Sequence, residues 1–143
     1  TDISAPALAQ AAKNVEKYGL QERIELRQGD LFEPLILPLD QFDLIASNPP
    51  YVSAAEYEML DKNVKDYEPR IALHAGEGGL DVYKRIAEKV GPFLKPDGIL
   101  LMEIGYSQGL AVRELFEQTG VFASIEVEKD FQKHDRVVVA KRG

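Results

Sequence analysis

Apolar residues recur at helical spacing in several parts of the chain, and the first of these patterns has clear start and stop signals. Its apolar positions are Leu8, Ala11, Ala12 and Val15. Ser4 suits the N-cap of this helix, Pro6 suits its first turn, and Gly19 ends it. The same spacing predicts helices over 80–90 and 107–120, and helical turns over 53–67.

Shorter apolar runs alternate with these helices and have the pattern of β-strands. The predicted strands are Ile24–Arg27, Phe42–Ala46, Ile99–Ile104, Phe122–Val127 and Arg136–Ala140. Ile99–Ile104 is nearly all apolar, as expected of a central strand covered on both faces, and the composition of 95–98 predicts a tight turn before it. The last two strands are joined by a short connection, which favours an antiparallel pair because a parallel crossover needs about a dozen residues. The order predicts an α/β, Rossmann-like domain with a mostly parallel sheet and one antiparallel strand near the C-terminus.

The strand over 42–46 runs into Asn48-Pro49-Pro50-Tyr51, which we call the lip. Proline fixes its own φ and has no N–H for a strand ladder, so two prolines in succession predict a stiff, extended exit from the strand. Ligands of open α/β sheets bind at the carboxyl ends of strands. The lip is therefore a candidate binding site.

The chemistry of the lip suits a planar amino group, whose delocalised lone pair makes it a poor nucleophile. The side-chain oxygen of Asn48 and the carbonyl of Pro49 can accept from its two N–H bonds, which positions the group and favours pyramidalisation. Tyr51 can stack against its flat face. Such catalysis rests on positioning and electrostatics, and it needs no histidine, metal or nucleophilic side chain.

Composition narrows the class of protein. The net charge of −7 and the pI of about 4.9 argue against an extended grip on nucleic-acid phosphates. The chain has no cysteine, which fits a reducing compartment, and no apolar run long enough to span a membrane. His74 and His134 are far apart in sequence and have no metal-ligand pattern, so both are interpreted as surface or packing residues. We expect a cytoplasmic protein without a metal.

The lip and several other segments resemble a known family. Asn48-Pro49-Pro50-Tyr51 is similar to the amino-methyltransferase motif of S-adenosylmethionine-dependent enzymes. The accompanying segments are Thr1–Ser4, Gly29–Phe32, Tyr67–Arg70, Glu77–Leu80, Glu103–Gly105 and Asp135–Val138. In this order they resemble the HemK-type release factor glutamine N5-methyltransferases, with the lip and Tyr-Glu-Pro-Arg as the most specific combination.

The resemblance implies a cofactor site for S-adenosylmethionine, with S-adenosylhomocysteine as the product. Asp2, followed by Ile3, resembles the acidic residue that binds the ribose hydroxyls. Asp30 with the backbone of Leu31 resembles the adenine contact, and Asn48 is expected to lie near the cofactor as well.

The resemblance also implies the substrate. Asn48, Pro49, Pro50 and Tyr51 resemble the clamp on the side-chain amide of a glutamine in a peptide chain release factor, with Asn48, Pro49 and Tyr51 in the catalytic role. The implied partner is the release factor, with no direct DNA binding and no membrane. Glu68 lies in a matching segment, but the residues give it no role.

Two family features have no counterpart here: a glycine-rich loop that cradles the methionine part of the cofactor, and an N-terminal helical domain. We therefore expect 1–143 to be the later part of a methyltransferase domain whose first strand and loop precede Thr1. Such a domain would expose strand edges and self-associate. The alternatives are an adenine-N6 DNA or RNA methyltransferase, which shares the lip motif, and an inactive fragment.

Some of these residues have simpler interpretations. The lip by itself terminates a strand, and Asp2 is an acid favoured at a helix N-terminus by the helix dipole. Asp30 follows Gly29 in an ordinary turn. Glu103 is interpreted as a structural carboxylate satisfied by backbone N–H groups. The matching segments, taken together, favour the functional interpretation of the lip, of Asp2 and of Asp30.

Overall fold

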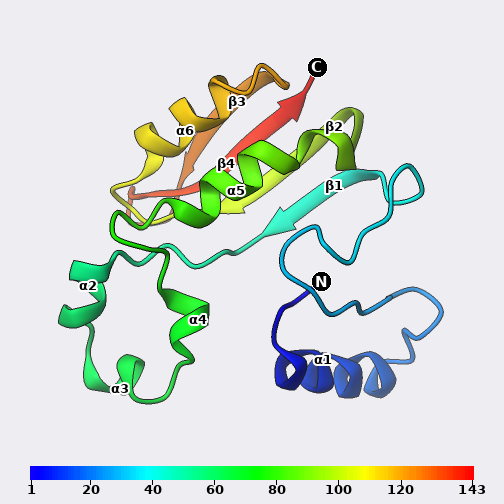
Figure 1. The fold of residues 1–143 in the computed structure, drawn as a ribbon, viewed down its shortest axis with the longest axis horizontal. Coiled ribbons are helices and arrows are strands. Elements are labelled where there is room, and N and C mark those ends of the chain that lie inside the picture. The colour runs from blue at the N-terminus through cyan, green and yellow to red at the C-terminus, as the bar shows by residue number, and fades with distance from the viewer. The chain divides into compact units, whose positions relative to one another are not determined.

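The computed structural model describes residues 1–143, which divide into two compact units, Thr1–Asp40 and Gln41–Gly143. The first unit contains α1 (Ala5–Lys17) and a long loop (Figure 1). The Ser4 hydroxyl accepts from the Ala7 N–H at 3.3 Å, which confirms the predicted N-cap. Gly19 follows the helix with a φ of 65°, a left-handed conformation that glycine adopts without strain.

The predicted strand Ile24–Arg27 is wrong. This segment has no strand ladder, and its neighbour Gln28 forms only an isolated parallel bridge with Asp2. The Asp2 N–H donates to the Arg27 carbonyl at 3.3 Å, and the Gly29 N–H donates to the Asp2 carbonyl at 3.1 Å. Pairing is limited to this single parallel bridge, because the cap of α1 follows Asp2 directly and no strand of residues 1–143 is hydrogen-bonded to 24–27.

Arg27 instead anchors the loop that follows it. Its guanidinium contacts the Asp40 carboxylate at 2.5 Å, and the same carboxylate oxygen accepts from the Ile36 N–H at 2.6 Å. These two bonds, the one from Arg27 first, hold the pKa of Asp40 below its ordinary value. No residue of Thr1–Asp40 is fully buried, so polar bonds such as these hold much of the loop in place.

The second unit is built on a sheet of four strands. In sequence they are β1 (Phe42–Ser47), β2 (Leu94–Glu103), β3 (Phe122–Lys129) and β4 (Asp135–Arg142), and in space the order is β1-β2-β4-β3. β1 and β2 are parallel, whereas β4 is antiparallel to both of its neighbours. The α/β architecture with one antiparallel strand near the C-terminus is as predicted.

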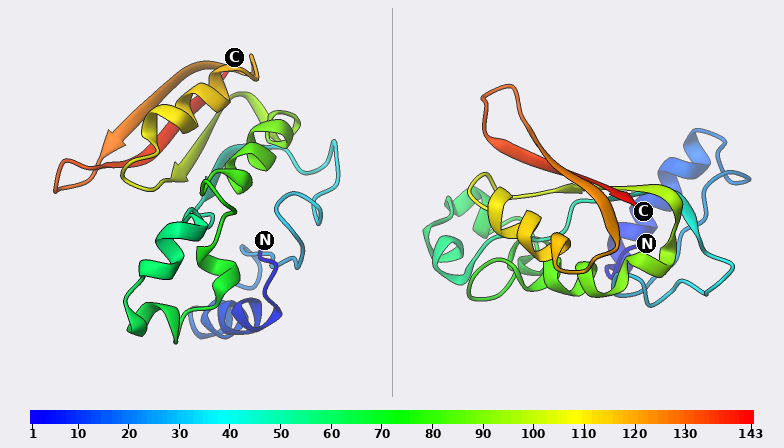
Figure 2. Two further views of the ribbon diagram at one scale, coloured as in Figure 1. Left: turned by 60° about the vertical axis from the view of Figure 1, so that its left-hand side comes forward. Right: turned by 90° about the horizontal axis from the view of Figure 1, so that it is seen from above.

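The helices of this unit fall into two groups. α5 (Asp81–Lys89) and α6 (Gly109–Glu117) lie on one face of the sheet, and the short η1 (Gly91–Phe93) follows α5 (Figure 2). Between the lip and α5 the chain makes a helical excursion, residues 53–73. It contains α2 (Ala54–Met59), α3 (Lys62–Lys65) and α4 (Arg70–Leu73). The helices predicted over 80–90 and the helical turns over 53–67 are confirmed.

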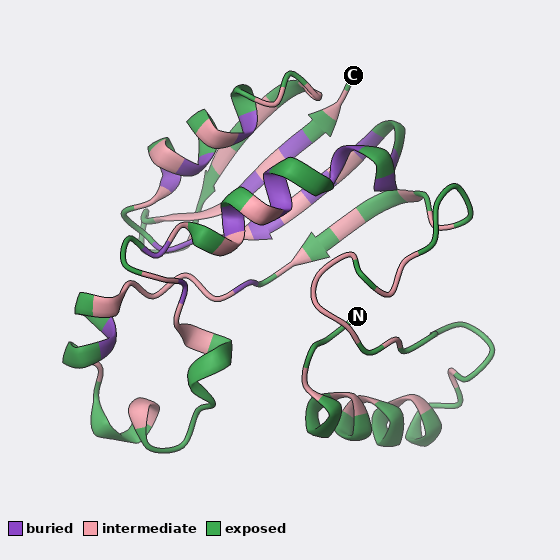
Figure 3. Ribbon diagram, in the orientation of Figure 1, coloured by how far each residue is buried: buried purple, intermediate pink, exposed green.

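The hydrophobic core lies between the sheet and the two long helices (Figure 3). Its largest fully buried side chains include Tyr83, Ile86, Leu100, Met102, Ile104, Val112, Phe116 and Val138. Along β2 the burial alternates, with Leu100 and Met102 buried while Leu101 and Glu103 are only half-buried. The prediction that both faces of β2 are covered is therefore not met within this unit, because α5 and α6 pack on the same face.

Two element boundaries also differ from the prediction. Gln108, not Ser107, is the N-cap residue of α6, and the helix ends at Glu117 before reaching Gly120. The segment 95–98 belongs to β2, but the pairing with β1 jumps there, and Asp97 has a φ of 61°. The turn-forming composition therefore produces a bulge inside a strand.

The one-sided core gives a stability prediction. Leu100→Ala removes a fully buried side chain at the centre of the sheet, so the free energy of unfolding should fall by about 2–5 kcal/mol. Leu44→Ala is the matched control, since Leu44 lies on the neighbouring strand and is 53% exposed. The loss there should stay within about 1 kcal/mol. Urea unfolding followed by circular dichroism measures both, and equal losses would contradict this location of the core.

Candidate active site

The lip lies at the carboxyl end of β1. Ser47, the last residue of β1, pairs with Met102 on the parallel strand β2, so the lip and Glu103 emerge at the same edge of the sheet. Asn48 is exposed, Pro49 is buried, and Tyr51 is half-buried. The side-chain amide that the sequence assigns to substrate binding is thus accessible, and the residue after it is packed into the protein.

Tyr51 is held at both of its polar ends. Its hydroxyl donates to Glu103 Oε1 at 3.3 Å, and its backbone carbonyl accepts from Gln108 Nε2 at 3.0 Å. Burial raises the pKa of the Tyr51 phenol, and the negative charge of Glu103 raises it further. The phenol therefore stays protonated at neutral pH and serves as a hydrogen-bond donor.

Glu103 begins a chain of charges along the edge of the sheet. Its carboxylate lies 4.0 Å from Arg136, and Arg136 lies 3.4 Å from Asp130. Backbone N–H groups of His134 and Gln132 donate to Asp130, and the His134 bond is the main cause that lowers the pKa of Asp130. The interpretation of Glu103 as a carboxylate satisfied by backbone N–H groups is therefore wrong, since its partners are the side chains of Tyr51 and Arg136.

The backbone just after the lip is paired with the end of the helical excursion. The Val52 N–H donates to the Leu73 carbonyl at 2.8 Å, and the Ala75 N–H donates to the Val52 carbonyl at 2.9 Å. Within the excursion, Ser53 and Glu56 form a capping box at the start of α2. The excursion thus both starts and ends beside the lip.

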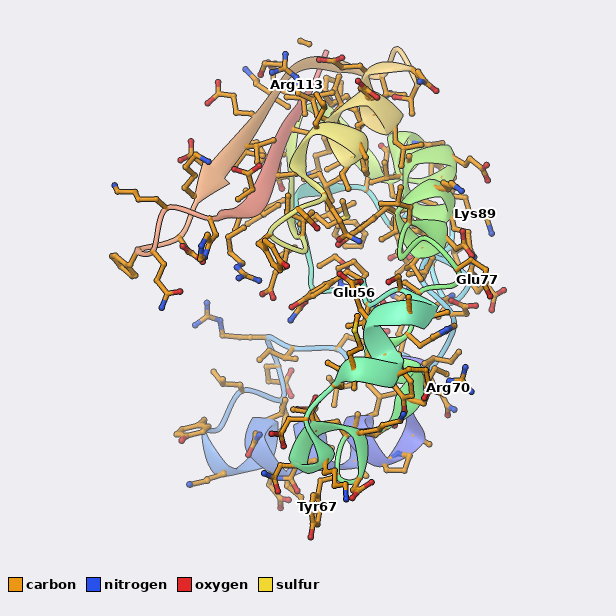
Figure 4. All side chains as sticks on the ribbon, turned by 90° about the vertical axis from the view of Figure 1, so that its left-hand side faces the viewer. Glu56, Tyr67, Arg70, Glu77, Lys89 and Arg113 are labelled. Atoms are coloured by element: carbon orange, nitrogen blue, oxygen red, sulfur yellow. The ribbon has the colours of Figure 1, made fainter.

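The segment Tyr67-Glu68-Pro69-Arg70 joins α3 to α4, and Figure 4 shows Tyr67 at the end of the excursion away from the sheet. Tyr67 is 83% exposed, Pro69 precedes α4 as its N-cap residue, and the Arg70 guanidinium lies 5.3 Å from the ring centre of Tyr57. Arg70 thus packs on the single buried side chain of α2. Glu68 still has no role.

Each of the two histidines packs against a tyrosine ring. The ring of His74 meets the ring of Tyr57 edge-on, with the centres 5.9 Å apart, and His134 lies 5.9 Å from the ring of Tyr106. Both histidines have the packing roles expected of them. No group of three or more histidine, cysteine, aspartate or glutamate side chains is arranged to hold a metal ion.

Four of the five residues that the sequence assigns to the cofactor, Asp2, Ile3, Asp30 and Leu31, lie in the first unit. Two contacts join the start of the chain to the turn at Asp30. One is the bridge between Asp2 and Gln28, and the other is a hydrogen bond of 3.3 Å from the Thr1 hydroxyl to the Leu31 carbonyl. Asp2 is exposed, and its Oδ1 accepts from the Ser4 N–H at 2.7 Å. Ile3 is 45% exposed. Asn48 belongs to the second unit.

Sequence reasoning missed Gln108. Its side chain is half-buried and bonds to the lip through Tyr51, yet it stands 57 residues away from Tyr51 in sequence. A polar residue directly after Gly-Tyr-Ser, at the head of an apolar helix pattern, was the one available signal. That signal indicates a cap rather than a contact with a distant loop.

Comparison with known proteins finds that the chain is similar to methyltransferases. A family model described as the RMKL-like methyltransferase domain (UPF0020) matches residues 1–64. A release factor glutamine methyltransferase of Clostridium acetobutylicum is 43% identical over 143 residues, which is 100% of this chain and 50% of that protein. Another, of Nitratidesulfovibrio vulgaris, is 42% identical over 142 residues, or 99% of this chain and 48% of that protein.

This chain is homologous to the release factor glutamine methyltransferases. It spans about half the length of the curated relatives it matches. A crystal structure of a methyltransferase from Pyrococcus furiosus matches 99% of this chain and 60% of its own, with a TM-score of 0.65 and 15% identity, which shows the shared fold. None of the helices combines the length and apolar character that a membrane span requires.

The contact between Tyr51 and Glu103 gives a prediction for the pH titration of the tyrosines. Tyr51 should ionise at a higher pH than the ordinary value for a tyrosine, and Glu103→Gln should lower the pKa of Tyr51 without removing the effect of burial. Ultraviolet absorbance of the phenolate follows the titration, and Tyr51→Phe identifies which step belongs to Tyr51.

The same shift has a defined effect on stability. Because the folded pKa lies above the unfolded value of about 10, the contribution of Tyr51 to stability is complete below that pH and is lost as the pH rises through the folded pKa. If the pKa of Tyr51 is the same in wild type and in Glu103→Gln, the contact is not made in solution.

Proposed function

We propose that this chain belongs to an enzyme that transfers a methyl group from S-adenosylmethionine to the side-chain amide nitrogen of a glutamine in a peptide chain release factor. One observation carries the proposal. The exposed amide of Asn48 stands at the carboxyl end of a strand, on a lip with two prolines whose last residue is held at both polar ends. The release factor glutamine methyltransferases that resemble this chain support the choice of substrate.

The lip residues make different contacts with the substrate amide. The Asn48 side-chain oxygen and the Pro49 carbonyl accept from the two N–H bonds of the substrate amide, which holds the nitrogen and draws its lone pair out of conjugation. The half-buried Tyr51 provides a wall against which the flat amide rests. These contacts favour the transition state by position and charge, with no covalent step on the protein.

S-adenosylmethionine, when bound, supplies an electrophilic methyl group on a sulfonium. The amide nitrogen of the substrate forms the new bond to carbon, the electrons of the old S–C bond go to sulfur, and a proton leaves the nitrogen for solvent. The residues present suit this cofactor in part. Asp2 is exposed with one carboxylate oxygen engaged by Ser4, and an acidic residue of this kind can accept from ribose hydroxyls.

Asp30 and the Leu31 backbone are proposed for the adenine, and Ile3 for the wall beside the ribose. The proposed substrate places the reaction in the cytoplasm, where release factors act.

Self-association remains a prediction, to be checked by light scattering on the purified chain. It is compatible with the position of β1 at the outer end of the strand order.

The experiment that tests the function is methyl transfer with an altered lip. Asn48→Ala removes one of the two acceptors, so the rate of methyl transfer from labelled S-adenosylmethionine to a release factor should fall by about 100-fold or more. Cofactor affinity, measured by calorimetry, should change little. Asn63→Ala, an exposed asparagine on α3, is the matched control and should keep the wild-type rate.

Two outcomes would contradict the proposal in different ways. A wild-type rate in Asn48→Ala would show that the lip does not hold the substrate amide. A wild-type chain that neither binds S-adenosylmethionine nor transfers a methyl group would support the interpretation of these 143 residues as inactive by themselves.

A further inference from the structure

The side chain of Gln108 is hydrogen-bonded to four residues of the second unit. Its Oε1 accepts from the Gly105 N–H at 3.0 Å and from the Tyr83 hydroxyl at 3.2 Å. Its Nε2 donates to the Tyr51 carbonyl at 3.0 Å and to the Gly79 carbonyl at 3.2 Å. A glutamine amide has two N–H donors and two acceptor lone pairs, so every hydrogen-bonding position of this side chain is used.

The surroundings of this amide hold it in one orientation. Gln108 stands at the head of α6, where its own N–H donates to the Gly105 carbonyl at 2.9 Å. Tyr83 comes from α5 and is fully buried, and that burial raises the pKa of its phenol, so the hydroxyl remains a donor. With a fixed donor at Oε1, the two N–H bonds of the amide face the carbonyls of Tyr51 and Gly79.

Two glycines leave the space that the amide occupies. A Cβ at Gly79, which has a φ of 70°, would lie 2.5 Å from the Tyr51 carbonyl oxygen and 2.8 Å from Gln108 Nε2. A Cβ at Gly105 would lie 2.6 Å from Gln108 Oε1. Both distances to the amide are shorter than real Cβ contacts, so the backbone on either side of Gln108 is shaped around this one side chain.

The lip needs such an anchor because of its prolines. Pro49 and Pro50 have no N–H, so neither can donate a backbone hydrogen bond that fixes the segment. β1 ends at Ser47, and backbone pairing resumes only at Val52. The Tyr51 carbonyl lies at the end of this gap, and Gln108 is the side chain that holds it.

We propose that Gln108 is a positioning residue for the lip. By fixing the Tyr51 carbonyl it sets the path of the backbone through Pro49, and hence the spacing between the Pro49 carbonyl and the Asn48 amide that receive the substrate. Gln108 does not itself touch the substrate; it acts through Tyr51. The inference rests on the proposed function for its catalytic consequence, whereas the anchoring of the lip can be measured without it.

The sharpest variant is Gln108→Glu, which keeps the shape of the side chain. Its carboxylate can still accept from Gly105 and Tyr83, but it places an oxygen where an N–H met the Tyr51 and Gly79 carbonyls. The turnover number for methyl transfer should fall by about 100-fold, the loss expected from displacing positioned groups by about 1 Å. The affinity for S-adenosylmethionine should stay at the wild-type value.

The pH profile separates positioning from a general loss of structure. Protonation of the introduced carboxyl restores one donor towards Tyr51, so the deficit of Gln108→Glu should shrink as the pH falls and grow as it rises. Gln118→Glu, at the end of the same helix and exposed, is the matched control and should show neither the deficit nor this pH dependence. A deficit independent of pH would contradict the proposed contact.

Amide hydrogen exchange on the 143-residue chain tests the anchor independently of catalysis. In Gln108→Ala, exchange at the Val52 and Gly105 N–H groups should accelerate about tenfold or more, while exchange at the core residue Val138 should keep its wild-type rate. Unchanged exchange at Val52 and Gly105, or equal acceleration at Val138, would overturn the proposal. If the wild-type chain transfers no methyl group, the proposed function fails, and the exchange result still decides whether Gln108 holds the lip.

Discussion

Two consecutive prolines, one residue after the end of β1, impose the constraint on which the rest of the site depends. They make the lip stiff, but they also remove the N–H groups with which a loop is normally tied down. Hydrogen bonds at the next residue, Tyr51, compensate for this loss. The Tyr51 hydroxyl donates to Glu103, and the Gln108 side chain donates to the Tyr51 carbonyl. The contacts of Tyr51 therefore fix the backbone of the lip, while the side-chain amide of Asn48 stays accessible to solvent.

The order of the strands places these two anchors. Because β1 and β2 are parallel neighbours, their carboxyl ends meet, and Glu103 comes within reach of Tyr51. The antiparallel β4 pairs with β2 on its other side and brings Arg136 towards the same carboxylate. α5 and α6 share one face of the sheet (Figure 2). Tyr83 of α5 and the cap residue Gln108 of α6 therefore come within hydrogen-bonding distance, and Gly105 bonds to the same amide oxygen. The site thus follows from the topology.

Sequence reasoning succeeded where the physical cause is local. The Ser4 cap, the proline exit after Ser47 and the short link between β3 and β4 each act within a few residues, and each is found as predicted. It failed where a distant partner decides. The alternation in 24–27 lacked a partner strand, and Gln108 has its role only because Tyr51, Gly79 and Tyr83, all at least 25 residues away in sequence, converge on it. Glu103 was assigned to backbone partners for the same reason, since Tyr51 lies 52 residues away in sequence.

The most direct test of the account is to identify the residue and side-chain group that receive the methyl group. Purified release factor would be incubated with the chain and S-adenosylmethionine, digested, and analysed by tandem mass spectrometry. The account predicts the added mass of one methyl group on the side chain of a glutamine, because the lip offers two acceptors to a planar amide. A methyl group on lysine, arginine or a nucleic-acid base, or no methylation of the release factor, would contradict it.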